Sequence, residues 1–205
     1  MTQMGRCMVT KDSSAGWLVG AIDELHLIIG KCIRMLELVE ELPTSMDCKV
    51  LKMLCGFQCM CLDLGSIVHT GDFTNVPPYF EGAVGNIEKW IDALSDKSVV
   101  PKLTQFIVMR SMDSCCLELH AARIKCREVE RRWVGHHHTS GTKPNDEAAG
   151  IAAYDRIAAT INRLSDLFFA LARYQQVVVV CEDETTRGDA VAAFESECGG
   201  VLAGM

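Results

Sequence analysis

The chain has 205 residues, a formal net charge of −7 and a hydrophobic fraction of 49%. That hydrophobic fraction excludes a mostly disordered chain, and the length fits a single domain with a buried core. The acidic balance argues against a nucleic-acid-binding protein, because phosphate contacts need clustered Lys and Arg. The longest purely apolar runs, such as residues 177–180, fall far short of the roughly 20 residues that cross a bilayer, so no membrane span is expected.

The N-terminal segment 1–16 lacks a helical pattern, and we expect it to be irregular. It has neither the apolar stretch of a secretory signal nor the repeated arginines of a transit peptide. The chain has 11 cysteines, most of them at positions where a helix would place a small apolar residue. We therefore expect reduced thiols, many of them in the core, and a reducing intracellular compartment.

Apolar residues recur at alternating spacings of three and four in five stretches, which predicts five amphipathic helices. The stripes cover residues 22–39, 50–68, 84–94, 119–133 and 157–171. Turn-forming residues separate them at 42–45, 71–78, 100–102 and 135–146. Long helices with mostly short connections pack as antiparallel bundles. The sequence thus predicts an all-α fold, a five-helix antiparallel bundle over residues 17–176.

The C-terminal extension, residues 177–205, does not fit the bundle pattern. It begins with a β-branched run and then becomes acidic and rich in Gly. A strand, a segment that docks on a partner and a disordered tail all remain open. We expect at least its last ten residues to be disordered.

Polar residues form a second stripe beside the apolar one on the fourth predicted helix, at His120, Arg123, Arg127, Glu130 and Arg131. The fifth predicted helix has a similar stripe at Asp155, Asn162, Asp166 and Arg173. Arginine suits bidentate contacts with phosphate or carboxylate, and a buried charge is costly unless it is paired or bound. Two interpretations stay open: solvated helix faces with i,i+4 pairs, or an anion site or subunit interface.

No metal site is predicted. The triplet His136, His137 and His138 falls in the predicted loop 135–146, and adjacent histidines cannot all face one ion. The cysteines show no pair of CxxC motifs with zinc spacing. The vicinal pair Cys115 and Cys116, at the start of a helix, is interpreted as packing.

Two blocks of sequence resemble the ATP:cob(I)alamin adenosyltransferases of the PduO/MMAB type. Residues 123–132, Arg-Ile-Lys-Cys-Arg-Glu-Val-Glu-Arg-Arg, are similar to the arginine-rich helix of that family. Residues 162–174, Asn-Arg-Leu-Ser-Asp-Leu-Phe-Phe-Ala-Leu-Ala-Arg-Tyr, resemble its last helix almost residue for residue. Shorter matches lie in the same order at 20–25, Gly-Ala-Ile-Asp-Glu-Leu, at Asp-Leu-Gly in 63–65 and at 105–108. The resemblance covers about residues 10–176.

The resemblance implies a homotrimer of five-helix bundles with active sites between neighbouring subunits. These would bind ATP, Mg²⁺ and cobalamin, and reduced cobalamin would attack the ribose C5′ of ATP and release triphosphate. The enzyme would supply no nucleophile, because the corrinoid carries the chemistry. The compartment would be the mitochondrial matrix or the bacterial cytoplasm.

The same resemblance implies roles for individual residues. Arg127 would contact the departing triphosphate, and Lys11, Glu130 and Asn162 would join it in holding ATP, with Asp166 in support. Asp23 and Arg123 would pair across the subunit boundary. Phe106 would lie beneath the corrin ring and displace its lower axial base.

The sequence also departs from the family pattern. The phosphate-binding loop of the form Gly-Asp-x-Gly-x-Thr has no counterpart in residues 1–9, and Glu128 replaces the second of two adjacent arginines. The loop before the last helix is about ten residues longer than usual. Two explanations are open: the native start lies upstream, or the chain is a degenerate homologue that serves as a structural or interaction subunit of a larger assembly.

Overall fold

The computed structural model of the protein contains five long or medium helices, and its described part ends at residue 180. The described residues are 1–4, 7–38, 44–73, 75–95, 100, 102–103, 107, 112–140 and 148–180. The helices are α1 (Ser14–Glu37), α2 (Thr44–Thr70), α3 (Ala83–Leu94), α4 (Ser114–Ser140) and α5 (Ala148–Val180). Phe106 and most of the predicted extension, from residue 181 on, lie outside the described residues.

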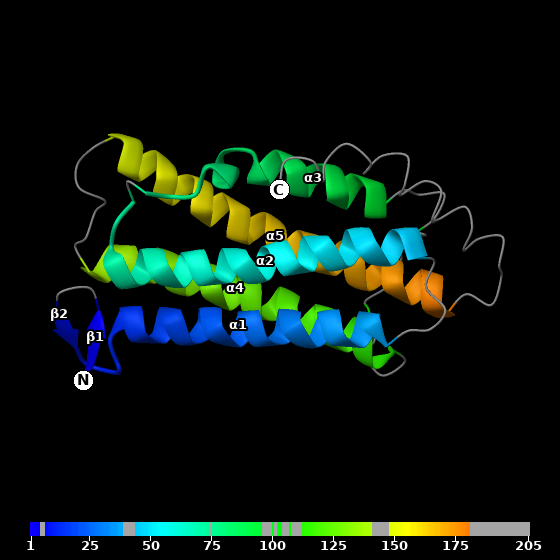
Figure 1. Ribbon diagram of the computed structural model, residues 1–205, viewed down its shortest axis with the longest axis horizontal. Coiled ribbons are helices and arrows are strands. Elements are labelled where there is room, and N and C mark those ends of the chain that lie inside the picture. The colour runs from blue at the N-terminus through cyan, green and yellow to red at the C-terminus, as the bar shows by residue number, and fades with distance from the viewer. Residues whose placement is uncertain are drawn as a thin grey trace.

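The long helices run side by side along the length of the molecule (Figure 1). Helix α4 packs against both α1 and α5, α1 also packs against α2, and α3 packs against α5. A short 3₁₀ helix, η1 (Pro78–Glu81), precedes α3. The all-α bundle predicted from the apolar stripes is therefore confirmed.

The core is one apolar cluster to which every long helix contributes. In the centre of α4, Cys126, Val129 and Trp133 have no exposed surface. Phe57 of α2 meets Phe168 of α5 edge to face, with ring centroids 6.2 Å apart. Such close packing between helices sets the side-chain positions on their polar faces as well.

Helix α2 has the length and hydropathy of a membrane-spanning helix. Its segment Lys49–Thr70 is long and apolar enough to cross a bilayer by length and composition alone. Met53, Leu54 and Phe57 of this segment are nevertheless buried in the bundle core. Because the core helices of globular bundles pass the same test, this hydropathy does not indicate a membrane span.

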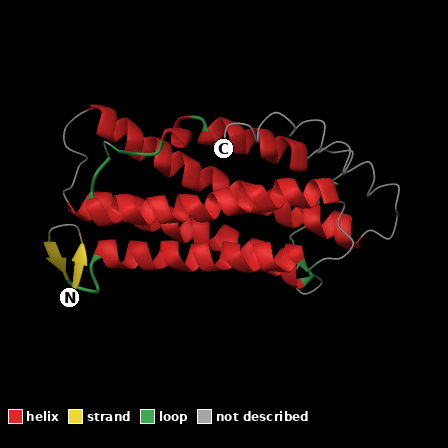
Figure 2. Cartoon of the chain, viewed as in Figure 1, coloured by secondary structure: helices red, strands yellow, loops and turns green. Residues whose placement is uncertain are grey.

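Residues 1–16, interpreted from the sequence as irregular, include a small β-hairpin (Figure 2). Strand β1 (Thr2–Met4) pairs antiparallel with β2 (Cys7–Val9), in the register Thr2 to Val9 and Met4 to Cys7. Strands of three residues are too short for period-two alternation to stand out, so the sequence pattern did not predict them.

Helix α1 then begins at Ser14, whose predecessor Ser13 is the N-cap. The Ser13 Oγ accepts a hydrogen bond from the Gly16 backbone N–H at 3.1 Å. A Cβ atom at Gly16 would stand 2.8 Å from the backbone oxygen of Lys11, so only glycine lets the chain approach this closely.

Two helix ends differ from the predicted boundaries. Helix α4 continues through Gly135 to Ser140, so the predicted loop 135–146 is wrong over its first half. The cost of a helical glycine, about 1 kcal/mol, is offset by contacts of the next turn with α1 and α5. Helix α5 likewise runs to Val180, beyond the predicted limit at residue 176, and Val177 packs against the core. The domain limits 17–176 and 177–205 stay predictions.

Candidate functional site

The polar faces of α4 and α5 meet at a hydrogen bond. The Asn162 side-chain amide donates to Glu130 Oε1 at 2.9 Å, and both residues are partly buried. Arg123 is seven residues before Glu130 on α4, and Phe169 is seven residues after Asn162 on α5. The guanidinium of Arg123 lies over the ring of Phe169, 5.5 Å from its centroid. Because antiparallel helices repeat their contacts every two turns, these pairs form one continuous row. We call this row, together with His120 and Arg127 of α4, the polar seam.

His120 lies at the buried end of the polar seam. It is 2% exposed, and its ring is 6.0 Å from that of Phe169 in an edge-to-face arrangement. Burial, and next the positive charge of Arg123, lower the pKa of His120 below the usual histidine value. The ring is therefore neutral at pH 7.

Arg127 stands one turn from Arg123 on α4 and is exposed. Among the described residues, neither Asp nor Glu forms an ion pair with it. Arg123 likewise has no ion pair among these residues, and its guanidinium lies over the ring of Phe169. Two guanidinium groups on successive turns without acidic partners can bind a polyanion, since arginine matches the oxygens of phosphate groups.

Glu128, the residue that departs from the family pattern, does not face the polar seam. Its carboxylate is 2.7 Å from both Lys125 Nζ and Arg132 Nη2, and these hydrogen bonds lower its pKa. Lys125 in turn pairs with Glu24 of α1. The negative charge at Glu128 is thus neutralised on the side of α4 that faces α1, away from Arg127.

Two further predicted site residues, Asp23 and Asp166, are exposed. Asp23 is exposed on α1 and forms no ion pair with Arg123 within the chain. Asp166 is exposed and pairs with its neighbour Arg163 at 3.1 Å. Phe106 lies outside the described residues, so its predicted corrin contact stays a prediction. Of the predicted ATP ligands, the fold brings Glu130 and Asn162 into direct contact.

Lys11 lies at the end of the bundle, just before α1. Ser14 Oγ is 2.9 Å from Nδ1 of His136, which ties the start of α1 to the last turns of α4. His136 lies about 14 Å beyond Arg127 along the helix axis. Lys11 precedes α1 at this end of the bundle, so it is separated from Arg127 along the bundle.

Sequence reasoning missed an aromatic cluster at this end. His137 packs against Tyr154 with ring centroids 4.2 Å apart, and Trp133 stacks on Tyr154 at 5.8 Å. Phe73, from the segment after α2, contacts the rings of both Trp133 and His137. All three members of the histidine triplet thus lie in the last turns of α4. The described residues contain no group of three metal-binding side chains.

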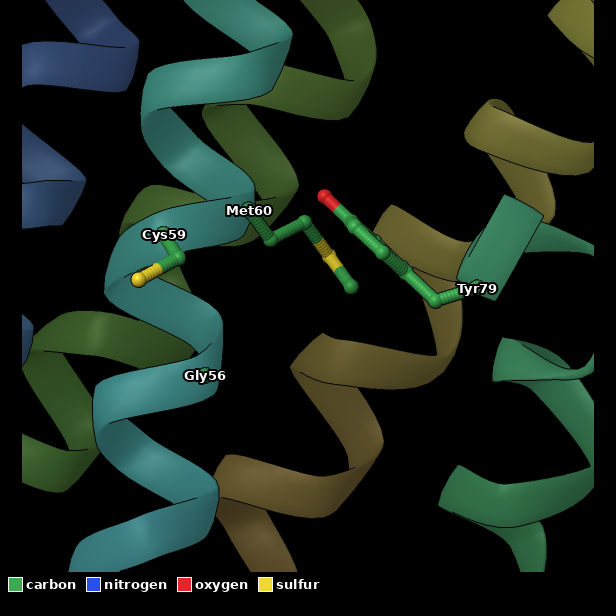
Figure 3. Close-up of a pocket in the computed structure, with 4 residues that line it drawn as sticks. All are labelled: Gly56, Cys59, Met60 and Tyr79. Atoms are coloured by element: carbon green, nitrogen blue, oxygen red, sulfur yellow. The ribbon is translucent and has the colours of Figure 1, made fainter. Parts of the chain in front are cut away.

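A separate cavity of about 170 Å³ lies between α2 and η1 (Figure 3). It is lined by Gly56, Cys59, Met60 and Tyr79, and the Tyr79 hydroxyl donates to Asp63 Oδ2 at 2.6 Å. In Figure 3, the side chains of Met60 and Tyr79 point toward each other, whereas that of Cys59 points away. The cavity shares no residue with the polar seam.

Two curated relatives match most of this chain. The corrinoid adenosyltransferase MMAB of Mus musculus is 32% identical over 170 residues, which is 80% of this chain and 63% of the relative. The MMAB protein of Homo sapiens is also 32% identical over 170 residues, 80% of this chain and 60% of the relative. The match thus spans about three-fifths of the length of these relatives.

Solved structures share the fold. A variant PduO-type ATP:corrinoid adenosyltransferase from Lactobacillus reuteri, complexed with ATP, superposes with a TM-score of 0.65 at 24% identity, covering 84% of this chain and 87% of the other. A second variant, complexed with cobalamin and ATP, gives a TM-score of 0.62 at 24% identity, covering 84% of each chain.

The model of the family described as cobalamin adenosyltransferase matches residues 1–175. The matched range includes the β-hairpin, the first four helices and α5 as far as residue 175, and it extends the resemblance seen in the sequence to residue 1. Together with relatives above 30% identity, this match shows that the chain belongs to the cobalamin adenosyltransferase family.

Proposed function

We propose that the chain transfers the 5′-deoxyadenosyl group of ATP to reduced cobalamin. The electron pair of cob(I)alamin forms the cobalt–carbon bond at C5′, and the C5′–oxygen bond breaks with release of triphosphate. The observation that carries this proposal is the polar seam. Its Glu130–Asn162 pair lies beside two arginines that have no acidic partner among the described residues.

The residues of the seam would align ATP and stabilise its leaving group. Arg127 neutralises charge that develops on the triphosphate, which is electrostatic stabilisation of the transition state. Glu130 and Asn162 hold each other in place, so their remaining hydrogen-bonding capacity is preorganised toward a nucleotide. Lys11 reaches the same ligand from the start of α1, Asp166 supports the seam, and Phe106 faces the corrin ring.

Mg²⁺ would accompany ATP. Magnesium in such sites is held largely by phosphates and water with one or two carboxylates, and the described residues provide the carboxylate of Glu130 without a prebuilt metal cage. The ion would offset the negative charge of the phosphates, and Glu130 together with Asn162 would hold the complex of Mg²⁺ and ATP.

The assembly we propose is a homotrimer with the site at the boundary between subunits. In support, Asp23 and Arg123 are unpaired with each other within one chain, as a pair that forms between two chains requires. The buried, free thiols Cys32, Cys61 and Cys126 suit a reducing compartment, either the mitochondrial matrix or the bacterial cytoplasm.

Spectroscopy tests the activity directly. Purified chain is incubated with ATP, Mg²⁺ and chemically reduced cobalamin, and the visible spectrum should change to that of adenosylcobalamin. Arg127→Ala should weaken ATP binding by roughly tenfold or more, because it removes charge-assisted hydrogen bonds. Arg34→Ala, which removes an exposed pair with Glu37, is the matched control and should bind ATP normally. A wild-type chain that never converts cobalamin contradicts the proposal.

A degenerate homologue that acts as a structural or interaction subunit is the second candidate. The residues before α1 form a β-hairpin and lack the Gly-Asp-x-Gly-x-Thr pattern, which favours this alternative. Under it, Arg127→Ala should leave assembly and partner binding unchanged, and the wild type should bind no ATP. Calorimetric titration of ATP into both proteins separates the two functions.

A further inference from the structure

Two side chains of the polar seam carry buried nitrogen atoms without hydrogen-bond partners. Within the part of the chain that the structure describes, neither ring nitrogen of His120 has a hydrogen-bond partner, and the same is true of Arg123 Nε. They lie one helical turn apart, and both contact the ring of Phe169. Because an unpaired buried polar group costs folding free energy, such groups call for a functional explanation.

The two unpaired groups are chemically complementary. Arginine Nε–H can only donate a hydrogen bond, whereas a neutral imidazole has one nitrogen that accepts. Residues three apart on a helix have Cβ atoms about 5–6 Å apart, so a change of the Arg123 rotamer is enough to bring donor to acceptor. In the single chain, contact with Phe169 holds the guanidinium in another position.

A carboxylate at the far end of Arg123 would favour this rotamer. The guanidinium head presents a fork of donors to a carboxylate and leaves Nε to a second acceptor. Asp23 is exposed on α1 and has no ion pair with any described residue, so it can supply such a carboxylate to a second copy of the chain. The chain itself therefore carries both halves of the contact.

We propose that His120 is a positioning residue for Arg123. Its neutral ring accepts a hydrogen bond from Arg123 Nε, and this directs the guanidinium head to Asp23 of a second copy across the subunit boundary. The inference rests on the homotrimer in the proposed function. It adds a residue that orients Arg123 from within its own subunit. His120 itself touches neither ATP nor cobalamin.

The test compares His120→Leu with His120→Gln. Leucine fills the site without an acceptor, whereas the glutamine side-chain oxygen can accept from Arg123. His26→Leu, at a half-buried histidine of α1 away from the seam, is the matched control. Self-association is measured by sedimentation velocity over a range of concentrations, and Arg123 Nε–H by ¹⁵N NMR, assigned with Arg123→Lys.

We expect His120→Leu to weaken self-association by about tenfold or more, as for loss of a hydrogen bond to a charged group. Its thermal midpoint, measured at a concentration where all variants are monomeric, should be unchanged or higher, because an unpaired buried group is gone. The slowly exchanging Nε–H signal should disappear in this variant. His120→Gln should restore both the association and the signal, and His26→Leu should match wild type.

Equal self-association of wild type and His120→Leu overturns the inference, as does a loss that His120→Gln fails to restore. A wild-type chain that stays monomeric overturns it too, whatever its activity. Failure of the proposed activity is distinct: the wild type would assemble and show the His120 effect, yet leave reduced cobalamin unconverted.

Discussion

Two glutamates close together on α4 show how local partners decide the role of a charge. Glu128 is held between Lys125 and Arg132, which keep its carboxylate ionised and neutralised. Glu130, on the other side of the helix, accepts a single hydrogen bond from Asn162. The charge reversal at Glu128 therefore does not place a free anion in the polar seam.

A pH dependence of stability follows from His120. Burial and Arg123 lower its pKa in the folded chain, so the unfolded chain takes up a proton first as pH falls through about 6.5. The stabilising contribution of the neutral ring is complete above that pH. It is lost progressively as pH falls toward the folded pKa.

Urea unfolding of wild type and His120→Leu at about pH 7.5 and about pH 5.5 measures this dependence. The wild type should lose more unfolding free energy than the variant on acidification, and the difference isolates His120 from the other histidines. A parallel loss in both proteins would show that the folded chain does not disfavour the protonated ring.

At the scale of elements, α1 and α4 are joined by contacts that repeat every seven residues. The Arg132 guanidinium lies 5.1 Å from the ring centroid of Trp17, Lys125 pairs with Glu24, and Glu118 pairs with Lys31 at 3.4 Å. The repeat arises because antiparallel helices meet again after two turns. These contacts fix the register of the helix that carries the polar seam.

The members of this row should contribute unequally. Lys125 is 16% exposed and joins two carboxylates, whereas Lys31 is 49% exposed and has a long contact with one. Lys125→Gln should lower the free energy of unfolding by about 1–2 kcal/mol, since it removes charged hydrogen bonds from a half-buried site. Lys31→Gln should cost at most about 0.5 kcal/mol.

Urea denaturation of both variants in low salt and in about 0.5 M NaCl tests this ranking. Salt screens exposed pairs most, so the small effect at Lys31 should vanish first. Equal effects of the two substitutions would mean that the second carboxylate adds nothing at Lys125.

The sequence predicted these elements unevenly, for physical reasons. Core-facing periodicity located all five helices, because a continuous apolar stripe needs a long helix to bury it. It could not locate the end of α4, where His136 and His137 are held by Ser14 and Tyr154 from distant parts of the chain. Arginines spaced along one face likewise predicted the polar seam. The sequence could not show that Phe169 belongs to it, because there Phe169 is one apolar residue among many on α5.

At the scale of the whole molecule, the cysteines divide according to the bundle. Of the seven cysteines whose side chains the structure describes, five are buried: Cys32, Cys61, Cys115, Cys116 and Cys126. Burial raises the pKa of the Cys32, Cys61 and Cys115 thiols to about 12, so these thiols are rarely ionised. Cys55 and Cys59, by contrast, are exposed on α2.

Native-state alkylation should therefore report the integrity of the bundle. With iodoacetamide, Cys55 and Cys59 should react quickly, because their thiols are exposed to the reagent. The buried cysteines should react only through opening of the helices, at rates slower by the equilibrium population of open chain. Peptide mass spectrometry with time resolves the two classes, and full labelling in urea is the control. Rapid labelling of Cys126 in the native chain would contradict this fold. That thiol is buried at the centre of α4, the helix that contacts α1 on one side and carries the polar seam with α5 on the other.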